Sequence, residues 1–149
     1  MNDQENIKVV VGADHGGFEL KEQIETFLKD KGFHVYDIGT HNTDSVDYPD
    51  ISEKVCEKVL DNSGFLGIVV CGTGIGVSIK ANRYAGIRAA LVHSAFTAEM
   101  AKAHNNANVL CLGARTTEKF EDALTWVQIW LDTAFEGGRH LKRIQKFDA

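Results

Sequence analysis

Hydrophobic and polar positions follow two different periods along this chain. Runs with the apolar content of buried strands cover residues 7–11, 34–38, 66–70, 87–92 and 108–112. Between these runs, apolar residues recur every three or four positions, as at Ile51, Val55 and Val59, which predicts amphipathic helices. Strands and helices that alternate in this way favour parallel strands joined by helical crossovers, a doubly wound α/β fold.

The last part of the chain predicts a long amphipathic helix over residues 117–135. Gly137 and Gly138 break this pattern before a short basic helix that begins near Arg139. No linker, internal repeat or low-complexity segment divides the 149 residues, so we expect a single domain over residues 1–149.

Polar and reactive residues follow several of the predicted strands. The first strand is followed by Asp14 and His15 between glycines, the third by Cys71, and the fifth by Arg115. Ligands of parallel α/β sheets bind beyond the carboxyl ends of the strands. We therefore expect these side chains to share one binding site.

Composition narrows the class of protein. A net charge of −5 without a basic run argues against nucleic-acid binding. No apolar stretch is long enough to predict a membrane span, and the polar, acidic residues 1–6 do not resemble a signal peptide. The odd count of three cysteines favours free thiols in a reducing cytoplasm, and their spacing fits no zinc site.

A glycine-rich loop follows the third predicted strand, with Gly72, Gly74 and Gly76 at every second position. Neither the dinucleotide-binding pattern nor the P-loop pattern fits this spacing. Such a loop can turn its backbone amides inward and bind an anion. The alternative is a tight turn that serves packing alone.

Cys71 stands at the start of this loop, where a helix N-terminus stabilises a thiolate. A thiol beside an anion-binding loop suggests acid–base or nucleophilic chemistry, although a lone cysteine is more often a small core residue. Cys56 lies in a helical apolar stripe and Cys111 lies inside a strand, so we expect both in the core.

Two other candidates also have an ordinary structural alternative. Asp14 beside His15 suggests ionisable groups of an active site, but Asp14 could also cap the helix that follows. His104 ends the predicted helix 95–103, where a histidine could simply interact favourably with the helix dipole.

Three arginines suit the binding of a phosphate group. Arg139 and Arg143 lie four positions apart, on one face of the last predicted helix, and Arg115 follows the fifth strand. Guanidinium groups bind phosphate in a bidentate manner. The alternative is a solvated basic face, which is the usual meaning of scattered arginines.

Five motifs stand out along the chain. They are Gly12-Ala13-Asp14-His15-Gly16-Gly17, Asp47-Tyr48-Pro49, Cys71-Gly72-Thr73-Gly74-Ile75-Gly76, His104-Asn105-Asn106-Ala107-Asn108 and Glu136-Gly137-Gly138-Arg139-His140. In this order and spacing they resemble the ribose-5-phosphate isomerase type B family, which also includes allose-6-phosphate and galactose-6-phosphate isomerases. The resemblance implies a Rossmann-like, three-layer α/β/α sandwich with a five-stranded parallel sheet. It also implies aldose–ketose isomerisation without a metal or other cofactor.

The resemblance further implies chemical roles. Cys71 would be the base that moves a proton between C1 and C2 of the open-chain sugar, with Thr73 assisting. His104 would open the furanose ring by proton transfer, together with Asp14. Backbone amides would hold the oxygens of a cis-enediolate, and they belong to Gly72, Thr73, Gly74, Ile75 and Gly76.

Substrate-binding residues follow from the same resemblance. Asn105 would bind a sugar or enediolate oxygen. The phosphate group would be held by His15, Arg115, Arg139 and Arg143.

Some members of that family use a glutamate just after the glycine loop as the base. Val77 occupies this position here, which favours the cysteine-dependent branch. Family members form dimers in which each active site draws on both subunits. We therefore expect a homodimer, or a tetramer built from dimers, and no different subunit, because this chain carries the whole set of motifs.

The leading interpretation is an isomerase of D-ribose 5-phosphate and D-ribulose 5-phosphate in pentose metabolism. The first alternative is an isomerase of a six-carbon sugar phosphate, such as allose 6-phosphate or galactose 6-phosphate. A non-catalytic sugar-phosphate sensor would bind the same ligands without turnover. A cysteine-dependent hydrolase or phosphatase is least favoured, because Val77 stands where such an enzyme carries an arginine.

Overall fold

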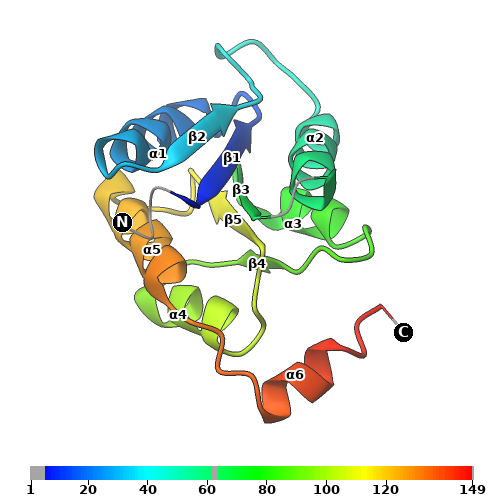
Figure 1. The fold of residues 1–149 in the computed structure, drawn as a ribbon. Helices are drawn as coiled ribbons and strands as arrows, with labels where there is room; N and C mark the ends of the chain where they lie inside the picture. The colour runs from blue at the N-terminus through cyan, green and yellow to red at the C-terminus, as the bar shows by residue number, and fades with distance from the viewer. Residues whose placement is uncertain (1–5, 62–63, 149) are drawn as a thin grey trace.

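The structure, a computed structural model, describes residues 6–61 and 64–148. Its centre is one sheet of five parallel strands in the order β2-β1-β3-β5-β4, shown in Figure 1. The strands are β1 (Lys8–Ala13), β2 (His34–Asp37), β3 (Phe65–Cys71), β4 (Ala89–Leu91) and β5 (Val109–Gly113). All five strands fall within or close to the predicted runs.

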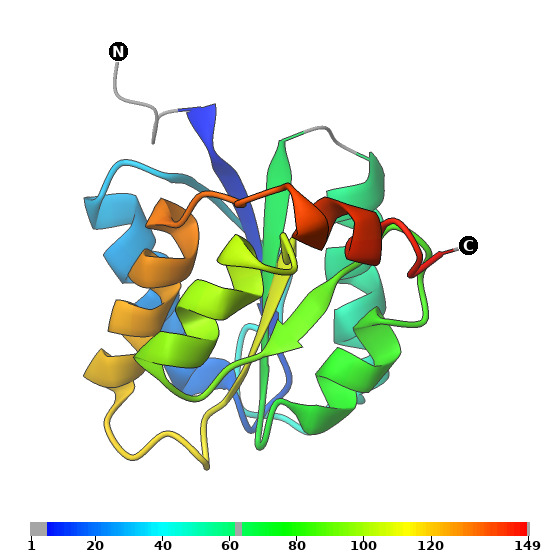
Figure 2. The same cartoon turned by 90° about the horizontal axis from the view of Figure 1, so that it is seen from below.

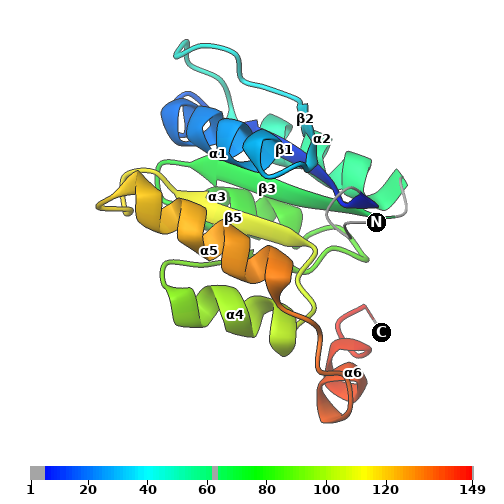
Figure 3. The same cartoon turned by 60° about the vertical axis from the view of Figure 1, so that its left-hand side comes forward.

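Helices cover both faces of the sheet, as Figure 2 shows. One layer contains α1 (Phe18–Asp30), α4 (Ala95–Ala103) and α5 (Phe120–Asp132), and the other contains α2 (Tyr48–Asp61) and α3 (Ile75–Ala81). A short last helix, α6 (Arg139–Ile144), stands apart from both layers (Figure 3). The predicted three-layer α/β/α sandwich is confirmed. Among the described residues, no helix has the length and apolar character needed to cross a membrane.

Alternate residues of β1 serve two separate hydrophobic cores. Val9 and Val11 are buried in the core beneath α1 and α5, while Val10 belongs to the core beneath α2 and α3. Trp130 of α5 is fully buried in the first core, and its indole N–H donates to the carbonyl oxygen of Ala107 over 3.1 Å. Burial on both faces explains why the strands read as continuous apolar runs rather than as alternating ones.

Two predicted boundaries differ from the structure. The strand expected at 87–92 is reduced to Ala89–Leu91, at the edge of the sheet, where β4 pairs with β5. The helix expected at 117–135 is shorter at both ends, because Thr117 and Thr133 do not have helical surroundings. The Thr117 hydroxyl donates to the carbonyl oxygen of Gly113 in the turn after β5. Thr133 has an extended backbone and ends α5.

Candidate active site

A cavity opens at the carboxyl ends of β1 and β3. The two strands are neighbours in parallel register, with Ala13 opposite Val70, so Asp14 and Cys71 leave the sheet side by side. The cavity has a volume of about 450 Å³. Its lining consists of Asp14, Tyr48, Cys71, Gly72, Thr73, Ile75, Gly76, Ile79 and Arg115. The structure therefore brings together Asp14, Cys71 and Arg115 at the carboxyl ends of β1, β3 and β5, whereas His15 is not part of this lining.

Cys71 is the last residue of β3, and it is 5% exposed. The backbone amide of Gly74 donates to its Sγ over 3.1 Å. The amide of the next residue, Ile75, donates to Oγ1 of Thr73 over 3.2 Å, and α3 begins at that residue. The sulfur therefore lies beside the first turn of α3 and accepts a hydrogen bond from the loop backbone.

Two glycines of the loop are required by packing as well as by any ligand. Gly74 has a left-handed backbone with φ 76°, and a Cβ built there would lie 2.5 Å from the Leu91 side chain. A Cβ on Gly76 would lie 2.5 Å from the ring of Tyr48. The loop is thus a tight turn that also places backbone amides beside a cavity, and the two sequence interpretations are compatible.

Asp14 is buried, and it holds the turn that leads into α1. Its Oδ1 accepts a hydrogen bond from the backbone amide of Gly17, the N-cap residue of α1, over 3.0 Å. Gly17 itself packs against β3, since a Cβ there would lie 2.5 Å from the carbonyl oxygen of Val70. Asp14 therefore holds the turn before α1 without being its N-cap residue, and it also lines the cavity that contains Cys71.

His15 contacts the long loop that precedes α2. Its Nδ1 accepts a hydrogen bond from the backbone amide of Val46 over 3.2 Å. When the imidazole is neutral, this contact puts the ring proton on Nε2, which leaves Nε2–H as a donor.

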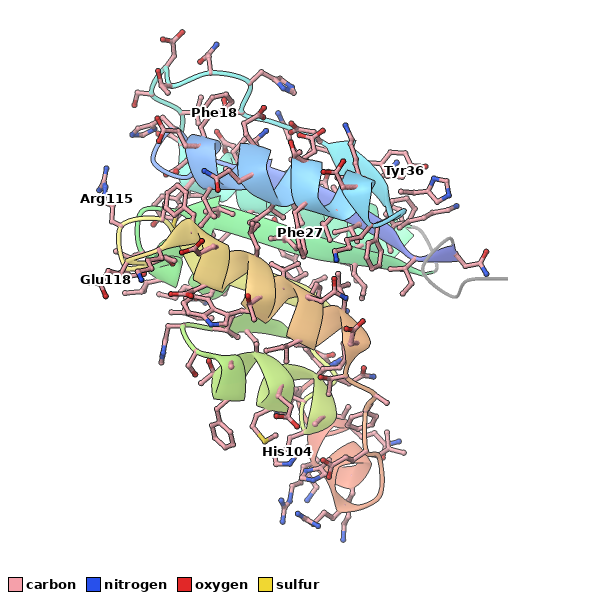
Figure 4. All side chains as sticks on the ribbon, turned by 90° about the vertical axis from the view of Figure 1, so that its left-hand side faces the viewer. Phe18, Phe27, Tyr36, His104, Arg115 and Glu118 are labelled. Carbon is pink, nitrogen blue, oxygen red and sulfur yellow. The ribbon has the colours of Figure 1, made fainter. Side chains whose placement is uncertain are left out.

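Arg115 supplies positive charge at the cavity. Its backbone amide donates to the carbonyl oxygen of Gly72 over 2.8 Å, which fixes the turn after β5 against the glycine loop. Its guanidinium lies over the same glycine, because a Cβ on Gly72 would be 3.1 Å from Nη1 of Arg115. An anion in the cavity would meet this exposed guanidinium, and Figure 4 shows Arg115 projecting from this end of the molecule.

The other two thiols belong to the core, as predicted. Cys56 and Cys111 are fully buried on the α2 and α3 side of the sheet. Burial raises the pKa of Cys56 to about 11. Burial also raises the pKa of Cys111, and the neighbouring Cys56 and Cys71 add to that effect. Both thiols are therefore protonated at neutral pH, which leaves Cys71 as the candidate for chemistry.

A single chain does not bring the remaining predicted residues to this cavity. Helix α4 starts at the carboxyl edge of the sheet and runs back to its amino edge, where it ends at His104 and Asn105. Figure 4 shows Arg115 and His104 at widely separated positions. Helix α6, with Arg139 and Arg143, lies beside His104, because the His140 ring stacks on the His104 ring.

Tyr48 and Ile79 line the cavity, although neither was given a role from the sequence. Tyr48 belongs to the Asp47-Tyr48-Pro49 motif, so its position in that motif was a signal that it lies at the site. Ile79 lies on α3, four residues after Ile75, and both side chains are half exposed. Its apolar spacing alone carries no such signal.

A second hollow of about 630 Å³ runs along the edge strand β4. Its lining includes Leu91 of the strand, Asn105 at the end of α4, and Phe147 near the C-terminus. Phe96 of α4 exposes 68% of its surface, and Phe147 exposes 55%. An exposed aromatic side chain such as Phe147 beside the edge strand of a sheet is typical of a surface that binds another chain.

The fold and the first cavity define a class of protein. A thiol, a carboxylate and a guanidinium at the carboxyl edge of a parallel sheet are typical of α/β enzymes that act on anionic substrates. Within that class, this chain belongs to the ribose/galactose isomerase family, whose sequence model matches residues 9–147.

Individual relatives agree with this assignment. Ribose-5-phosphate isomerase B of Escherichia coli (strain K12) is 39% identical over 142 residues, which cover 95% of each chain. The structure of Clostridium thermocellum ribose-5-phosphate isomerase B matches with a TM-score of 0.93 at 47% identity, over 95% of each chain. The Mycoplasma genitalium ribose-5-phosphate isomerase B with bound ribulose-5-phosphate matches with a TM-score of 0.90 at 43% identity, over 94% of this chain and 93% of that chain. The predicted family and fold are confirmed.

Proposed function

We propose that this chain is an aldose–ketose isomerase that interconverts D-ribose 5-phosphate and D-ribulose 5-phosphate through a cis-enediolate. The observation that carries the proposal is the position of Cys71, a thiol that receives a backbone hydrogen bond and lines a cavity together with Asp14 and Arg115. The structural relative with bound ribulose-5-phosphate supports the choice of substrate. The 149 residues act as one isomerase domain.

Cys71 is the base in this proposal. Its thiolate removes the C2 proton of the open-chain aldose and returns that proton to C1, while O2 loses a proton and O1 gains one. Thr73 assists from the same cavity, where its hydroxyl already contacts the loop backbone. The amides of residues 72–76 lie at the start of α3, so they stabilise the negative charge of the enediolate as it forms.

Ring opening and substrate anchoring need groups beyond this cavity. His104 acts as the proton-transfer group that opens the furanose ring, with Asp14 at the other end of the ring. Asn105 binds a sugar oxygen, and the phosphate is held by His15, Arg115, Arg139 and Arg143. Within one chain, His104 lies far from Arg115 (Figure 4), which lines the same cavity as Cys71, so these roles require a second copy of the chain.

We therefore propose a homodimer, alone or paired into a tetramer, whose active sites are shared. The hollow along β4 supports this arrangement, because it is apolar in part and contains Asn105. An isologous contact at this face would carry His104 and α6 of each copy toward the cavity of the other. The three free thiols support a reducing, cytoplasmic setting.

A mixing experiment tests the shared site. Cys71→Ala and His104→Asn are each expected to inactivate the pure protein. If the sites are shared, unfolding and refolding a 1:1 mixture restores about a quarter of the wild-type activity, because each mixed dimer contains one intact site. If both residues act within one chain, the mixture stays inactive. The dimer mass is measured by light scattering on the same samples.

Substrate choice is tested by direct assay. The protein is treated with EDTA and incubated with D-ribose 5-phosphate, and ketose formation is followed. D-allose 6-phosphate and D-galactose 6-phosphate are run in parallel, because the family that contains this chain is named for both ribose and galactose. Turnover of the pentose ester supports the proposal, turnover of a hexose ester alone replaces the substrate, and binding without turnover indicates a sensor.

A further inference from the structure

Three side chains from different parts of the chain meet at the amino edge of the sheet. His104 ends α4, Glu136 lies in the segment after α5, and His140 lies on α6. The two imidazole rings are stacked, with centroids 4.1 Å apart and planes inclined by 12°. Glu136 faces both rings, with Oε2 at 3.7 Å from Nε2 of His104 and Oε1 at 3.6 Å from Nε2 of His140.

A second observation, independent of these distances, concerns the burial of His140. Its side chain is 8% exposed, and its Nε2 is buried without a hydrogen-bond partner among the described residues. Buried polar atoms almost always have a partner, so an orphaned ring nitrogen that faces a carboxylate indicates a missing ligand. Burial lowers the pKa of His140, as do the positive charges of His104, Arg139 and Arg143, against the opposing effect of Glu136. The unpartnered Nε2 beside this carboxylate is therefore available to a ligand.

The three side chains favour particular metal ions. The ligating atoms of His104, Glu136 and His140 all lie within 4.8 Å of one another. Two imidazole nitrogens and a carboxylate oxygen suit Zn²⁺, Co²⁺ or Ni²⁺, whereas Ca²⁺ and Mg²⁺ prefer oxygen alone. Tetrahedral coordination with bonds of about 2.0–2.2 Å places ligand atoms about 3.3 Å apart. The two rings must therefore tilt toward each other to bind one ion. There is room for this movement, because the side chain of His104 is 37% exposed and that of Glu136 is 53% exposed.

A second cluster of side chains, all of them acidic, does not form a comparable metal site. Glu22, Glu25 and Asp37 also lie close together. The buried ammonium of Lys21 already forms ion pairs with Glu22 and Asp37. A lysine in that position supplies the positive charge that a cation would bring, so that group does not call for a metal ion.

We propose that His104, Glu136 and His140 bind one divalent transition-metal ion per chain, and that this ion inhibits the enzyme by engaging His104. Water completes the coordination. The inhibitory consequence rests on the proposed function, in which His104 opens the sugar ring, whereas the metal site itself does not depend on that function. The site is distinct in chemistry from the isomerase reaction, because the ion blocks a proton-transfer group and takes no part in turnover.

Binding is tested on tag-free, EDTA-washed protein by calorimetric titration with Zn²⁺ and by the visible absorption of bound Co²⁺. A single ion per chain is expected, with Co²⁺ bands free of sulfur-to-metal charge transfer, which separates the site from the cysteines. His140→Gln and Glu136→Gln are each expected to weaken binding by at least about tenfold. His34→Gln removes an exposed histidine of β2 and serves as the matched control, with unchanged affinity. Wild-type affinity in both His140→Gln and Glu136→Gln would overturn the site.

Inhibition is tested separately. Zn²⁺ is expected to slow the turnover of D-ribose 5-phosphate by the wild-type protein, and excess EDTA is expected to restore it. In His140→Gln and Glu136→Gln, turnover in EDTA persists, and the Zn²⁺ concentration for half inhibition rises by the same factor as the dissociation constant. Equal inhibition of wild type and both variants would refute the link to this site. A wild-type protein without turnover in EDTA would refute the proposed function instead, while the titration still decides the metal site.

Discussion

The backbone amide of Gly74 points at Sγ of Cys71 and donates a hydrogen bond to it over 3.1 Å. This contact fixes the sulfur between the end of β3 and the start of α3, where the helix dipole adds to the positive potential. Gly74 is the N-cap residue of α3, and its left-handed backbone, with φ 76°, leads directly into this helix. Gly74 thus contacts the thiol through this hydrogen bond, and its lack of a Cβ leaves space for the Leu91 side chain.

Cys71→Ala tests the role of this thiol. We expect kcat for D-ribose 5-phosphate to fall by about 10²–10⁴-fold, because the base is removed. Binding of D-ribulose 5-phosphate, measured by calorimetry, should remain nearly unchanged, since the cavity loses one atom. Cys56→Ala is the matched control: it removes a core thiol that does not line the cavity, lowers stability by about 1 kcal/mol and keeps kcat. Wild-type kcat in Cys71→Ala would exclude the thiol as the base.

Gly76→Ala tests the contact between α3 and Tyr48. The new Cβ would lie 2.5 Å from the Tyr48 ring, and overpacking of this kind costs about 1–3 kcal/mol. The displaced ring should also raise KM, because Tyr48 lines the cavity. Thermal unfolding and steady-state kinetics measure both effects.

The double variant makes this test specific. In a Tyr48→Ala background the clash is absent, and Gly76→Ala should then stabilise α3 by about 0.5–1 kcal/mol, the usual advantage of alanine over glycine in a helix. The sign of the stability change is therefore expected to reverse between the two backgrounds. The same change in both backgrounds would show that Tyr48 is not what makes glycine necessary here.

Local patterns were sufficient to predict much of this molecule. The helix predicted at 95–103 matches Ala95–Ala103, because the capping box of Ser94 and Thr97 and the left-handed Asn106, with φ 45°, are local features. The cavity residues Asp14, Cys71 and Arg115 were also found, since each lies at the carboxyl end of a strand of a parallel sheet.

The remaining features depend on contacts between distant segments. The packing of Tyr48 on Gly76 requires α2 and α3 to lie side by side, which neither helix sequence specifies. The position of His104 follows from the direction in which α4 returns along the sheet, and the same direction separates it from Cys71. The sequence motif named His104 as a candidate, but a local motif carries no information about how far this residue lies from Cys71 in the fold.

Lys21→Met tests a buried ion pair on the α1 side of β2. Lys21 is fully buried and donates to Asp37, whose carboxylate also accepts the backbone amide of Gly39 over 2.9 Å. Removing the lysine leaves a carboxylate largely shielded from water, so we expect the free energy of unfolding to fall by about 3 kcal/mol at pH 7. Lys29→Met is the control, because the Lys29–Glu25 pair is exposed and its loss should leave stability nearly unchanged.

The pH dependence of Lys21→Met adds a second readout. Burial alone would raise the pKa of Asp37, but the hydrogen bond from Lys21 helps to bring this pKa below its usual value. The wild-type ion pair therefore contributes fully above the unfolded pKa of about 3.9 and is lost as the pH falls through the lower folded pKa. Without Lys21, burial is expected to raise the pKa of Asp37 above its usual value, so that ionised Asp37 destabilises the folded variant. The stability gap between wild type and variant should then narrow below about pH 4, as measured by urea unfolding; a constant gap would contradict the assigned ion pair.

Lys102→Met tests a buried cation above an aromatic ring. Nζ of Lys102 lies 4.9 Å from the centroid of Trp130, and the lysine is 9% exposed. Burial lowers the pKa of Lys102, so the folded state releases this proton at a lower pH than the unfolded state, whose lysine titrates near 10.4. Between these two pKa values the unfolded state binds the extra proton, so this group makes wild-type stability rise with pH across that window.

Methionine keeps the length of the Lys102 side chain and cannot titrate. The stability of Lys102→Met relative to wild type should therefore be highest at pH 7 and should decline as the pH approaches 10, measured by urea unfolding with tryptophan fluorescence. Lys119→Met, which removes an exposed lysine next to α5, is the control and should show no such decline. A parallel pH dependence of wild type and Lys102→Met would mean that Lys102 keeps its proton above the ring throughout this range. The cation–π contact with Trp130 would then offset the cost of burial.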